Sequence, residues 1–360
     1  MTKMIDEIEH YLQEVAHTSS EKQGTIAVFL PTVSVVIPTY NRKDMLREAL
    51  NSLAQQTYPT DRFEIIVVDD GSTDGTDQIA AGAFPFTLRY FWQTNQGDAT
   101  ARNLGARQSQ ADILVFLDDD ILVEPDYLTY LIREHDLCQS RIVVGTMNIR
   151  PEETTPLSHT LNASLASKQN SVELAFTDVY SNNMALRREA YFEVGMMQDL
   201  GFPGSSMWCD IDLAYRAYQQ GFDFRRSTQA RCWHRDYFAS SMDRYKPRIR
   251  TAAYRAVVLF QKYPELPPHL HMFSDKTPIS WGQDPPRLIV RKLVRSMASS
   301  RPAMWGMEQL VSALEKRYPA SRILPSLYRY IIGGNIFQGY REGLRKFGQV
   351  DHKDEPVLLA

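Results

Sequence analysis

Short apolar runs alternate with segments of helical periodicity in the first third of the chain. The runs VSVVIPT, FEIIVVD and ILVFL begin at Val33, Phe63 and Ile113 and are rich in β-branched residues. Short apolar runs bounded by polar and turn residues are typical of strands buried on both faces. Between these runs, residues 43–56 and 97–110 carry apolar side chains at helical spacing. This order of elements predicts a parallel α/β sheet with right-handed crossovers.

Polar or turn-forming residues end each of these runs. Pro38 and Thr39 end the first, Asp69 and Asp70 the second, and residues 118–120, all aspartates, the third. Two carboxylates ~5 Å apart repel by roughly 3 kcal/mol at an effective dielectric of ~20, so a cation should relieve the triplet. Ligands of parallel sheets bind beyond the carboxyl ends of the strands. We therefore expect a ligand site at this edge, the alternative being a solvated acidic turn.

The ligand expected at this edge is a diphosphate held through a metal ion. Neither early strand is followed by a GxGxxG or Walker pattern that could cradle phosphates. Carboxylates suit Mg²⁺ or Mn²⁺, which also bind diphosphate oxygens, and the spacing of Asp118 and Asp120 fits such a bridge. Asp70 is a candidate for hydrogen bonding to a nucleobase, or it stabilises a turn in DDGSTDG.

A further helix is predicted in residues 206–221, SMWCDIDLAYRAYQQG. Leu213 and Ala217, with Tyr218 as a third candidate, lie on its packed side, and Gly221 ends it. Asp210 in its first turn is either a cap or a chemical group. His234 follows, and a lone histidine is more often an ordinary packed residue than a ligand.

The sequence divides into four parts by pattern. We expect a helical lead-in at 1–30, a catalytic domain at 31–240, a basic helical extension at 241–350 and a tail at 351–360. Residues 287–347 carry 12 Lys and Arg against three Glu, with apolar residues between them. Two interpretations stay open: this segment contacts an anionic surface, either membrane lipid or a lipid-linked acceptor, or it packs on the core.

Composition adds few constraints. The chain of 360 residues is 43% hydrophobic and 23% charged with a net charge of −3, which gives no case for nucleic acid. We see neither a secretory leader nor an apolar run long enough to span a membrane. Cys138, Cys209 and Cys232 form neither a disulfide framework nor a metal pair. A cytoplasmic location is expected, at the inner face of the plasma membrane if the extension binds lipid.

Seven motifs in order resemble those of family 2 glycosyltransferases. They are VSVVIPTYNR, QTYP…FEIIVVDDGSTDGT, NQGDATARNLG, DILVFLDDD…PDYL, SNNMALRREAYFEVGMM, CDIDLAYRAYQQG and the histidine at 234. The resemblance covers about residues 33–237 and, weakly, the segment LYRYIIGGNIFQGYREGLRKFG.

The family implies a GT-A-type, Rossmann-like fold: a mixed, mainly parallel sheet flanked by helices. Residues 31–120 would bind the nucleotide sugar and residues 121–240 the acceptor. The implied activity is metal-dependent transfer of a sugar, with inversion, from a nucleotide diphosphate donor to an acceptor hydroxyl. UDP is the expected nucleotide, Mn²⁺ or Mg²⁺ the expected cofactor, and a glycan or lipid-linked molecule the expected acceptor.

The resemblance also implies roles for individual residues. Asp210 matches the general base, and Asp118, Asp120 and His234 match groups that reach the metal or diphosphate. Contacts with the nucleotide or the donor sugar fall to Pro38, Thr39, Asn41, Arg42, Asp70, Gly97, Arg102, Asp118, Asp119, Asn182 and Asn183.

One position departs from the family pattern: Cys209 stands where relatives usually carry Glu before the base. This departure supports an alternative, a nucleotide-sugar-binding protein with impaired catalysis. A second alternative is a sugar nucleotidyltransferase, although IPTYNRKD lacks the Gly-rich basic signature expected of one.

Overall fold

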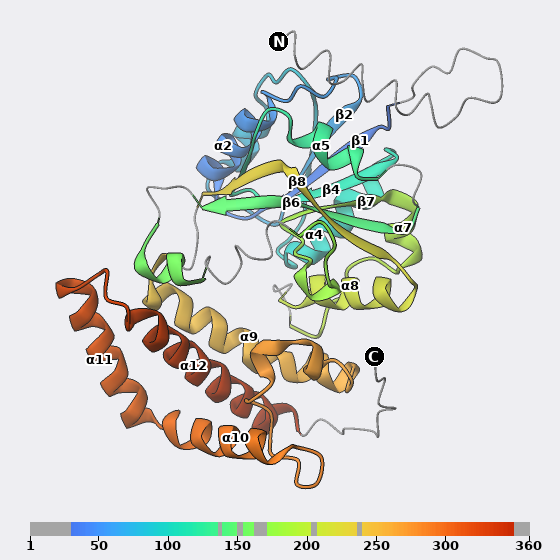
Figure 1. Cartoon of the computed structure of the whole chain (residues 1–360). Helices are drawn as coiled ribbons and strands as arrows, with labels where there is room; N and C mark the ends of the chain where they lie inside the picture. The colour runs from blue at the N-terminus through green and yellow to red at the C-terminus, as the bar shows by residue number, and fades with distance from the viewer. Residues whose placement is uncertain are drawn as a thin grey trace.

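One mixed sheet forms the centre of the molecule (Figure 1). The computed structural model describes residues 30–135, 139–149, 154–161, 171–202, 207–235 and 240–348. The helical lead-in and the tail expected at the two ends therefore lie almost wholly outside the described residues. The sheet has the strand order β3-β2-β1-β4-β7-β6-β8-β5. Its strands are β1 (Val33–Thr39), β2 (Phe63–Asp69), β3 (Thr87–Trp92), β4 (Ile113–Leu117), β5 (Ile121–Val123), β6 (Arg141–Ile149), β7 (Asn183–Arg187) and β8 (Asp223–His234).

The first half of the sheet is parallel and the second half is mixed. β1 pairs in parallel with β2 and β4, and β2 with β3. β7 runs antiparallel between β4 and β6, whereas β8 runs parallel to β6 and antiparallel to β5. The predicted mixed, mainly parallel sheet is confirmed. β3 was not foreseen, because it is an edge strand whose side chains are half-buried or exposed.

Helices cover both faces of the sheet because the central strands are apolar on both faces. In β1, Val35 and Ile37 belong to one core cluster and Val36 to the other. α2 (Lys43–Leu53) and α5 (Tyr127–Arg133) pack in the first cluster. The second cluster receives α4 (Asp98–Gln108), α7 (Arg188–Glu193) and α8 (Cys209–Gln219). A short helix, α3 (Thr76–Ala80), follows β2.

The predicted helix around residues 206–221 is confirmed in most details. Leu213 and Ala217 are fully buried, and Gly221 follows the helix with a φ of +78°. Glycine adopts this left-handed conformation without the steric cost that a Cβ atom would bring. Tyr218 is 51% exposed, but its ring packs against those of Phe176 and Tyr215, so it lies at the edge of the packed side.

A helical extension follows the sheet (Figure 1). It consists of α9 (Met242–Lys262), the 3₁₀ turns η4 (Pro267–His269) and η5 (His271–Phe273), α10 (Pro286–Ala298), α11 (Arg301–Arg317) and α12 (Leu324–Phe347). The buried face of α9, including Val257 and Phe260, belongs to the same core cluster as the sheet residue Phe116. Ile336 and Tyr340 of α12 join that cluster. The inner part of the extension thus shares the apolar core of the sheet domain.

Two glycines let α12 approach α9 closely. A Cβ atom on Gly339 would lie 2.1 Å from the carbonyl oxygen of Arg250, and one on Gly343 would lie 2.3 Å from that of Tyr254. Any side chain at either position would push the helices apart.

Within the described residues, no helix combines the length and apolarity needed to cross a lipid bilayer.

Gly339→Ala should lower the free energy of unfolding by about 1–3 kcal/mol, because overpacking forces backbone shifts. Urea denaturation measures the change. Gly306→Ala is the matched control: Gly306 lies in α11 with nothing within 4 Å of its added Cβ. That variant should be unchanged or more stable by up to ~1 kcal/mol. Equal stability of the two variants would contradict the close contact of α9 with α12.

Candidate active site

The three aspartates after β4 are compensated by two arginines. Arg42, which precedes α2, donates to Asp119 Oδ1 at 2.9 Å and to Asp120 Oδ2 at 2.8 Å. Arg102 of α4 donates to Asp118 Oδ1. The carboxylates come from one strand end and the guanidinium groups from two other elements, so their charges meet only in the folded protein. The positive charge that offsets the three carboxylates thus comes from arginine side chains.

Arg102 lies inside the protein. It is only 1% exposed, and its second donor bond runs to Asp98 Oδ2 at 2.8 Å. Burial disfavours the charged guanidinium, but the two carboxylates outweigh burial and raise the pKa of Arg102 above its ordinary value. The expected contact with nucleotide or diphosphate does not fit this burial. Arg102 instead positions Asp118.

The pKa values of Asp118 and Asp119 are raised in spite of the arginines. Burial raises the pKa of Asp119 to about 7, and the charge of Asp120 adds to this, whereas Arg42 acts in the opposite direction. Asp119 Oδ2 also accepts a hydrogen bond from Thr39 Oγ1 at 2.8 Å. Burial likewise raises the pKa of Asp118. Negative charge is therefore concentrated at the end of β4, where burial disfavours the ionised form of the carboxyl groups.

Oxygen acceptors remain at this edge for a further cation. Asp120 Oδ1 and Asn182 Oδ1 are buried and accept no hydrogen bond from any described residue. His234, the last residue of β8, lies with Nε2 4.0 Å from Asp120 Oδ1. The described residues contain no group of three or more His, Cys, Asp or Glu side chains already arranged around one point. Even so, carboxylate and amide oxygens beside an imidazole are a donor set that fits a hard divalent cation.

Two side chains predicted to touch the nucleotide, Asp70 and Asn41, accept hydrogen bonds that hold the loops before α4 and α2. Asp70, 4% exposed, accepts bonds from Gln93 Nε2 at 2.7 Å and from the backbone N–H groups of Gln96 and Gly97, both at 2.8 Å. Asp70 thus holds the loop before α4, whereas the alternative had placed its role in the DDGSTDG turn. Asn41 Oδ1 accepts from the N–H of Thr73 at 2.8 Å. Both side chains hold loops at the edge where the strands end.

The two adjacent asparagines take different places. Asn183, the first residue of β7, is 3% exposed, and its Nδ2 donates to the carbonyl oxygen of Gly145 at 3.1 Å while its Oδ1 accepts from the N–H of the same residue. Its amide therefore joins β7 to β6, and this does not fit the expected contact with the donor sugar. Asn182 lies beside Asp118, whose N–H donates to the Asn182 carbonyl oxygen at 3.1 Å.

Asp210 lies in the first turn of α8, half-buried, with Oδ1 accepting from the N–H of Ile211 at 2.9 Å. Burial raises the pKa of Asp210 to about 6. The nearby Asp98 carboxylate adds to this rise, whereas Arg102 and the N–H of Ile211 oppose it. Asp210 therefore lies close enough to Asp98 and Arg102 for their charges to affect its ionisation. A carboxyl group that ionises near neutral pH is suited to accept a proton.

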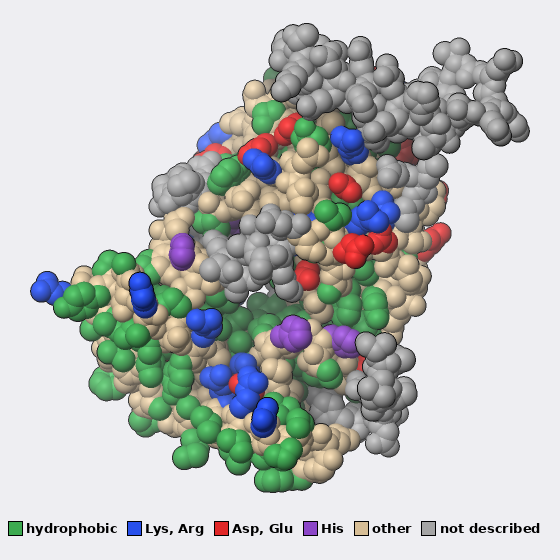
Figure 2. All heavy atoms as spheres, viewed as in Figure 1, with side chains coloured by type: hydrophobic (Ala, Val, Ile, Leu, Met, Phe, Trp, Pro, Cys, Tyr) green, Lys and Arg blue, Asp and Glu red, His purple; other side chains and the backbone are tan. Residues whose placement is uncertain are grey.

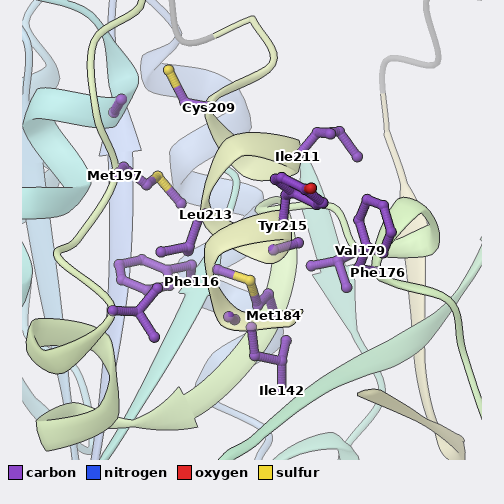
Figure 3. Packing of buried hydrophobic residues seen from close by; sticks show 14 of the residues in the cluster. Phe116, Ile142, Phe176, Val179, Met184, Met197, Cys209, Ile211, Leu213 and Tyr215 are labelled. Carbon is purple, nitrogen blue, oxygen red and sulfur yellow. The ribbon is translucent and has the colours of Figure 1, made fainter. Parts of the chain in front are cut away.

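The residues before Asp210 fix the start of α8. Trp208 has a φ of +74°, which is strained for a bulky side chain, and its indole N–H donates to the carbonyl oxygen of Ala252 in α9 at 2.7 Å. Cys209 is 1% exposed, donates to the carbonyl oxygen of Gln198 at 3.0 Å, and belongs to the core cluster with Leu213 (Figure 3). Burial raises the pKa of Cys209 to about 12, so its thiol stays neutral.

Asp98 was not among the predicted site residues. It accepts from Arg102 and influences the pKa of Asp210, and its side chain is 44% exposed. Its spacing of four residues from Arg102 on one helix was the available signal, because residues at i and i+4 lie on the same face.

Known proteins resemble this chain in sequence and in fold. Residues 34–195, which include the aspartates after β4, match the family model described as glycosyl transferase family 2. The chain is 38% identical over 137 residues to validoxylamine A glucosyltransferase of Streptomyces hygroscopicus subsp. jinggangensis, covering 37% of this chain and 32% of that protein. It is 44% identical over 94 residues to glycosyltransferase AglE of Haloferax volcanii, covering 25% and 31%. The matches thus span about a third of the length of these curated relatives.

A solved structure resembles nearly the whole chain. It is the mannosyltransferase PcManGT from Pyrobaculum calidifontis in complex with GDP-Man and Mn²⁺, with a TM-score of 0.56 and 22% identity over 92% of this chain and 94% of that one. This likeness establishes the GT-A-type fold, including C-terminal helices. In sequence, residues 34–195 match glycosyl transferase family 2, and the two curated relatives are glycosyltransferases as well.

Proposed function

We propose that the protein transfers a sugar, with inversion, from a nucleoside diphosphate donor to an acceptor hydroxyl. The observation that carries this proposal is the half-buried carboxyl group of Asp210, whose pKa burial raises to about 6. It interacts electrostatically with Arg102, the hydrogen-bond partner of Asp118. Relatives named as glucosyltransferase and mannosyltransferase support sugar transfer. UDP stays the nucleotide expected from the sequence, and the GDP-Man bound by PcManGT makes GDP the second to test.

Asp210 is proposed to act as the general base. The acceptor oxygen forms a bond to the anomeric carbon while its proton passes to the Asp210 carboxylate. The bond from the same carbon to the diphosphate breaks on the opposite face, and the diphosphate leaves with that electron pair. An α-linked donor therefore gives a β-linked product. A positioned base commonly accelerates such a step by roughly 10²–10⁴.

The diphosphate is proposed to lie at the aspartates after β4. Asp118, Asp120 and His234 would hold Mn²⁺ or Mg²⁺, and Asn182 Oδ1 is a further oxygen acceptor there. Such an ion, when bound, supplies positive charge that stabilises a departing diphosphate. Arg102 holds the Asp118 carboxylate in place, and Arg42 and Thr39 hold that of Asp119. These bonds pre-organise the edge before any ligand arrives.

Asp210→Asn should lower kcat by roughly 10²–10⁴, because the amide keeps the shape but cannot accept a proton. Donor binding should stay within a few-fold, since Asp210 is not proposed to touch the diphosphate. Steady-state transfer and calorimetric titration of the donor measure the two quantities. The kcat/KM of the unmodified protein should fall about tenfold per pH unit below pH ~6, as the base becomes protonated.

Cys209→Ala is the neighbouring control for Asp210→Asn. The buried thiol packs in the core, so this variant should keep kcat within a few-fold and lose about 1 kcal/mol of stability with its one hydrogen bond. Full activity of Asp210→Asn, or an α-linked product from an α-linked donor, would contradict the mechanism. Donor binding by the unmodified protein without any turnover would favour a nucleotide-sugar-binding protein.

Asp120→Ala should abolish the part of donor binding that depends on a divalent ion, because it removes a buried carboxylate oxygen that accepts no hydrogen bond from the described residues. Thermal stabilisation by UDP-sugars and GDP-sugars, with Mn²⁺, with Mg²⁺ or with chelator, measures this dependence. Asp44→Ala, on the exposed end of α2, is the control for loss of a carboxylate. Normal metal-dependent stabilisation of Asp120→Ala would overturn the assignment.

A further inference from the structure

Exposed apolar side chains gather in one part of the molecule. Among the described residues, 14 large hydrophobic side chains are exposed, and nine of these lie between Trp281 and Ile323. Figure 2 shows hydrophobic side chains along the outer edge formed by α10 and α11, with Lys and Arg side chains next to them. Single exposed apolar residues are ordinary, but a contiguous group marks an interaction surface.

α10 turns its apolar side to solvent. Val290, Leu293, Val294 and Met297 lie at the i, i+3, i+4 and i+7 positions of one helical face and are 46–79% exposed. The buried residue of this helix is instead Lys292, whose Nζ donates to Asp284 Oδ2 at 2.7 Å and to the carbonyl oxygen of Pro278 at 2.9 Å. A helix of a globular protein normally has the opposite arrangement. We call these four residues the α10 stripe.

A basic pocket adjoins the α10 stripe. It has a volume of about 400 Å³ and lies between α10, α12 and the segment before α10. Its lining includes Lys276, Lys292, Arg341 and Arg345, the stripe residue Leu293, and no acidic side chain. The two lysines are paired with Asp275 and Asp284, whereas Arg341 and Arg345 are exposed.

We propose that α10 docks on the surface of an anionic lipid bilayer. The α10 stripe lies in the headgroup region, and a lipid phosphate binds at Arg341 and Arg345. An apolar face flanked by cations is the pattern of interfacial helices. The charge excess of 287–347 suits an anionic partner and disfavours a second copy of the chain, whose stripe carries the same cations beside it. The proposal is independent of the sugar-transfer activity.

Co-sedimentation of the full chain with vesicles tests the proposal. Binding should be strong to phosphatidylcholine vesicles that contain phosphatidylglycerol, weak to phosphatidylcholine alone, and reduced by salt. Val294→Asp should lower the partition coefficient about tenfold, because the charged side chain cannot replace buried apolar area. Arg341→Gln should lower it about fivefold, which corresponds to ~1 kcal/mol for one cation near the surface.

Matched controls separate the surface from general effects of the substitutions. Val172→Asp, at a valine 42% exposed outside the extension, and Arg47→Gln on α2 should both bind as the unmodified chain does. Equal binding to neutral and anionic vesicles, or none at low salt, would overturn the proposal. So would self-association that Val294→Asp abolishes without any vesicle binding. Binding of inorganic phosphate at the pocket, without any binding of the chain to vesicles, would make the pocket a site for free anions. That result would also overturn membrane docking.

Discussion

The charge of three consecutive carboxylates at the end of β4 is the constraint around which the site is built. Arg42 and Arg102 compensate it from two different elements, and Thr39 adds a hydrogen bond from the end of β1. Arg102 is almost completely buried, so α4 must keep its place against the sheet for Asp118 to keep its counter-charge. Removing one member of a buried ion pair is strongly destabilising, because the other charge then stays buried alone. The acidic edge and the fold are therefore mutually dependent.

The helical extension has two layers with different physical roles. α9 and α12 complete the core: their buried faces share one apolar cluster with the sheet residue Phe116. The indole N–H of Trp208, two residues before the proposed base, donates to the α9 backbone. α10 and α11 lie further out and expose much of their apolar surface. The same basic, amphipathic composition thus serves packing in one layer and leaves an unpartnered surface in the other. The packing interpretation holds for α9 and α12, and the membrane interpretation stays a proposal for α10.

Elements with strong local signals were predictable. β1, β2 and β4 are buried on both faces and are therefore almost continuously apolar, and α2 and α8 carry clear helical spacing. β3 escaped prediction because a half-exposed edge strand lacks a continuous apolar run. The order of the strands after β4 was likewise unreadable, since pairing of β7 with β4 depends on contacts distant in sequence. The same holds for the site residues: their types could be read from the sequence, but the residues to which they bond could not.

The sequence by itself determined which chemistry can occur here: three aspartates after a buried strand, an aspartate opening a later helix, and a basic C-terminal segment. Only the tertiary structure decided which of the predicted groups form bonds within the fold and which keep acceptor atoms that the described residues leave free. Arg102 and Asn183 are buried and bonded internally, whereas Asp120 and Asn182 keep buried acceptors unused by the described residues. The physical reason is that burial and counter-charge arise from elements far apart along the chain. A residue's type sets what it can bind, and its neighbours in space decide whether that capacity is already taken.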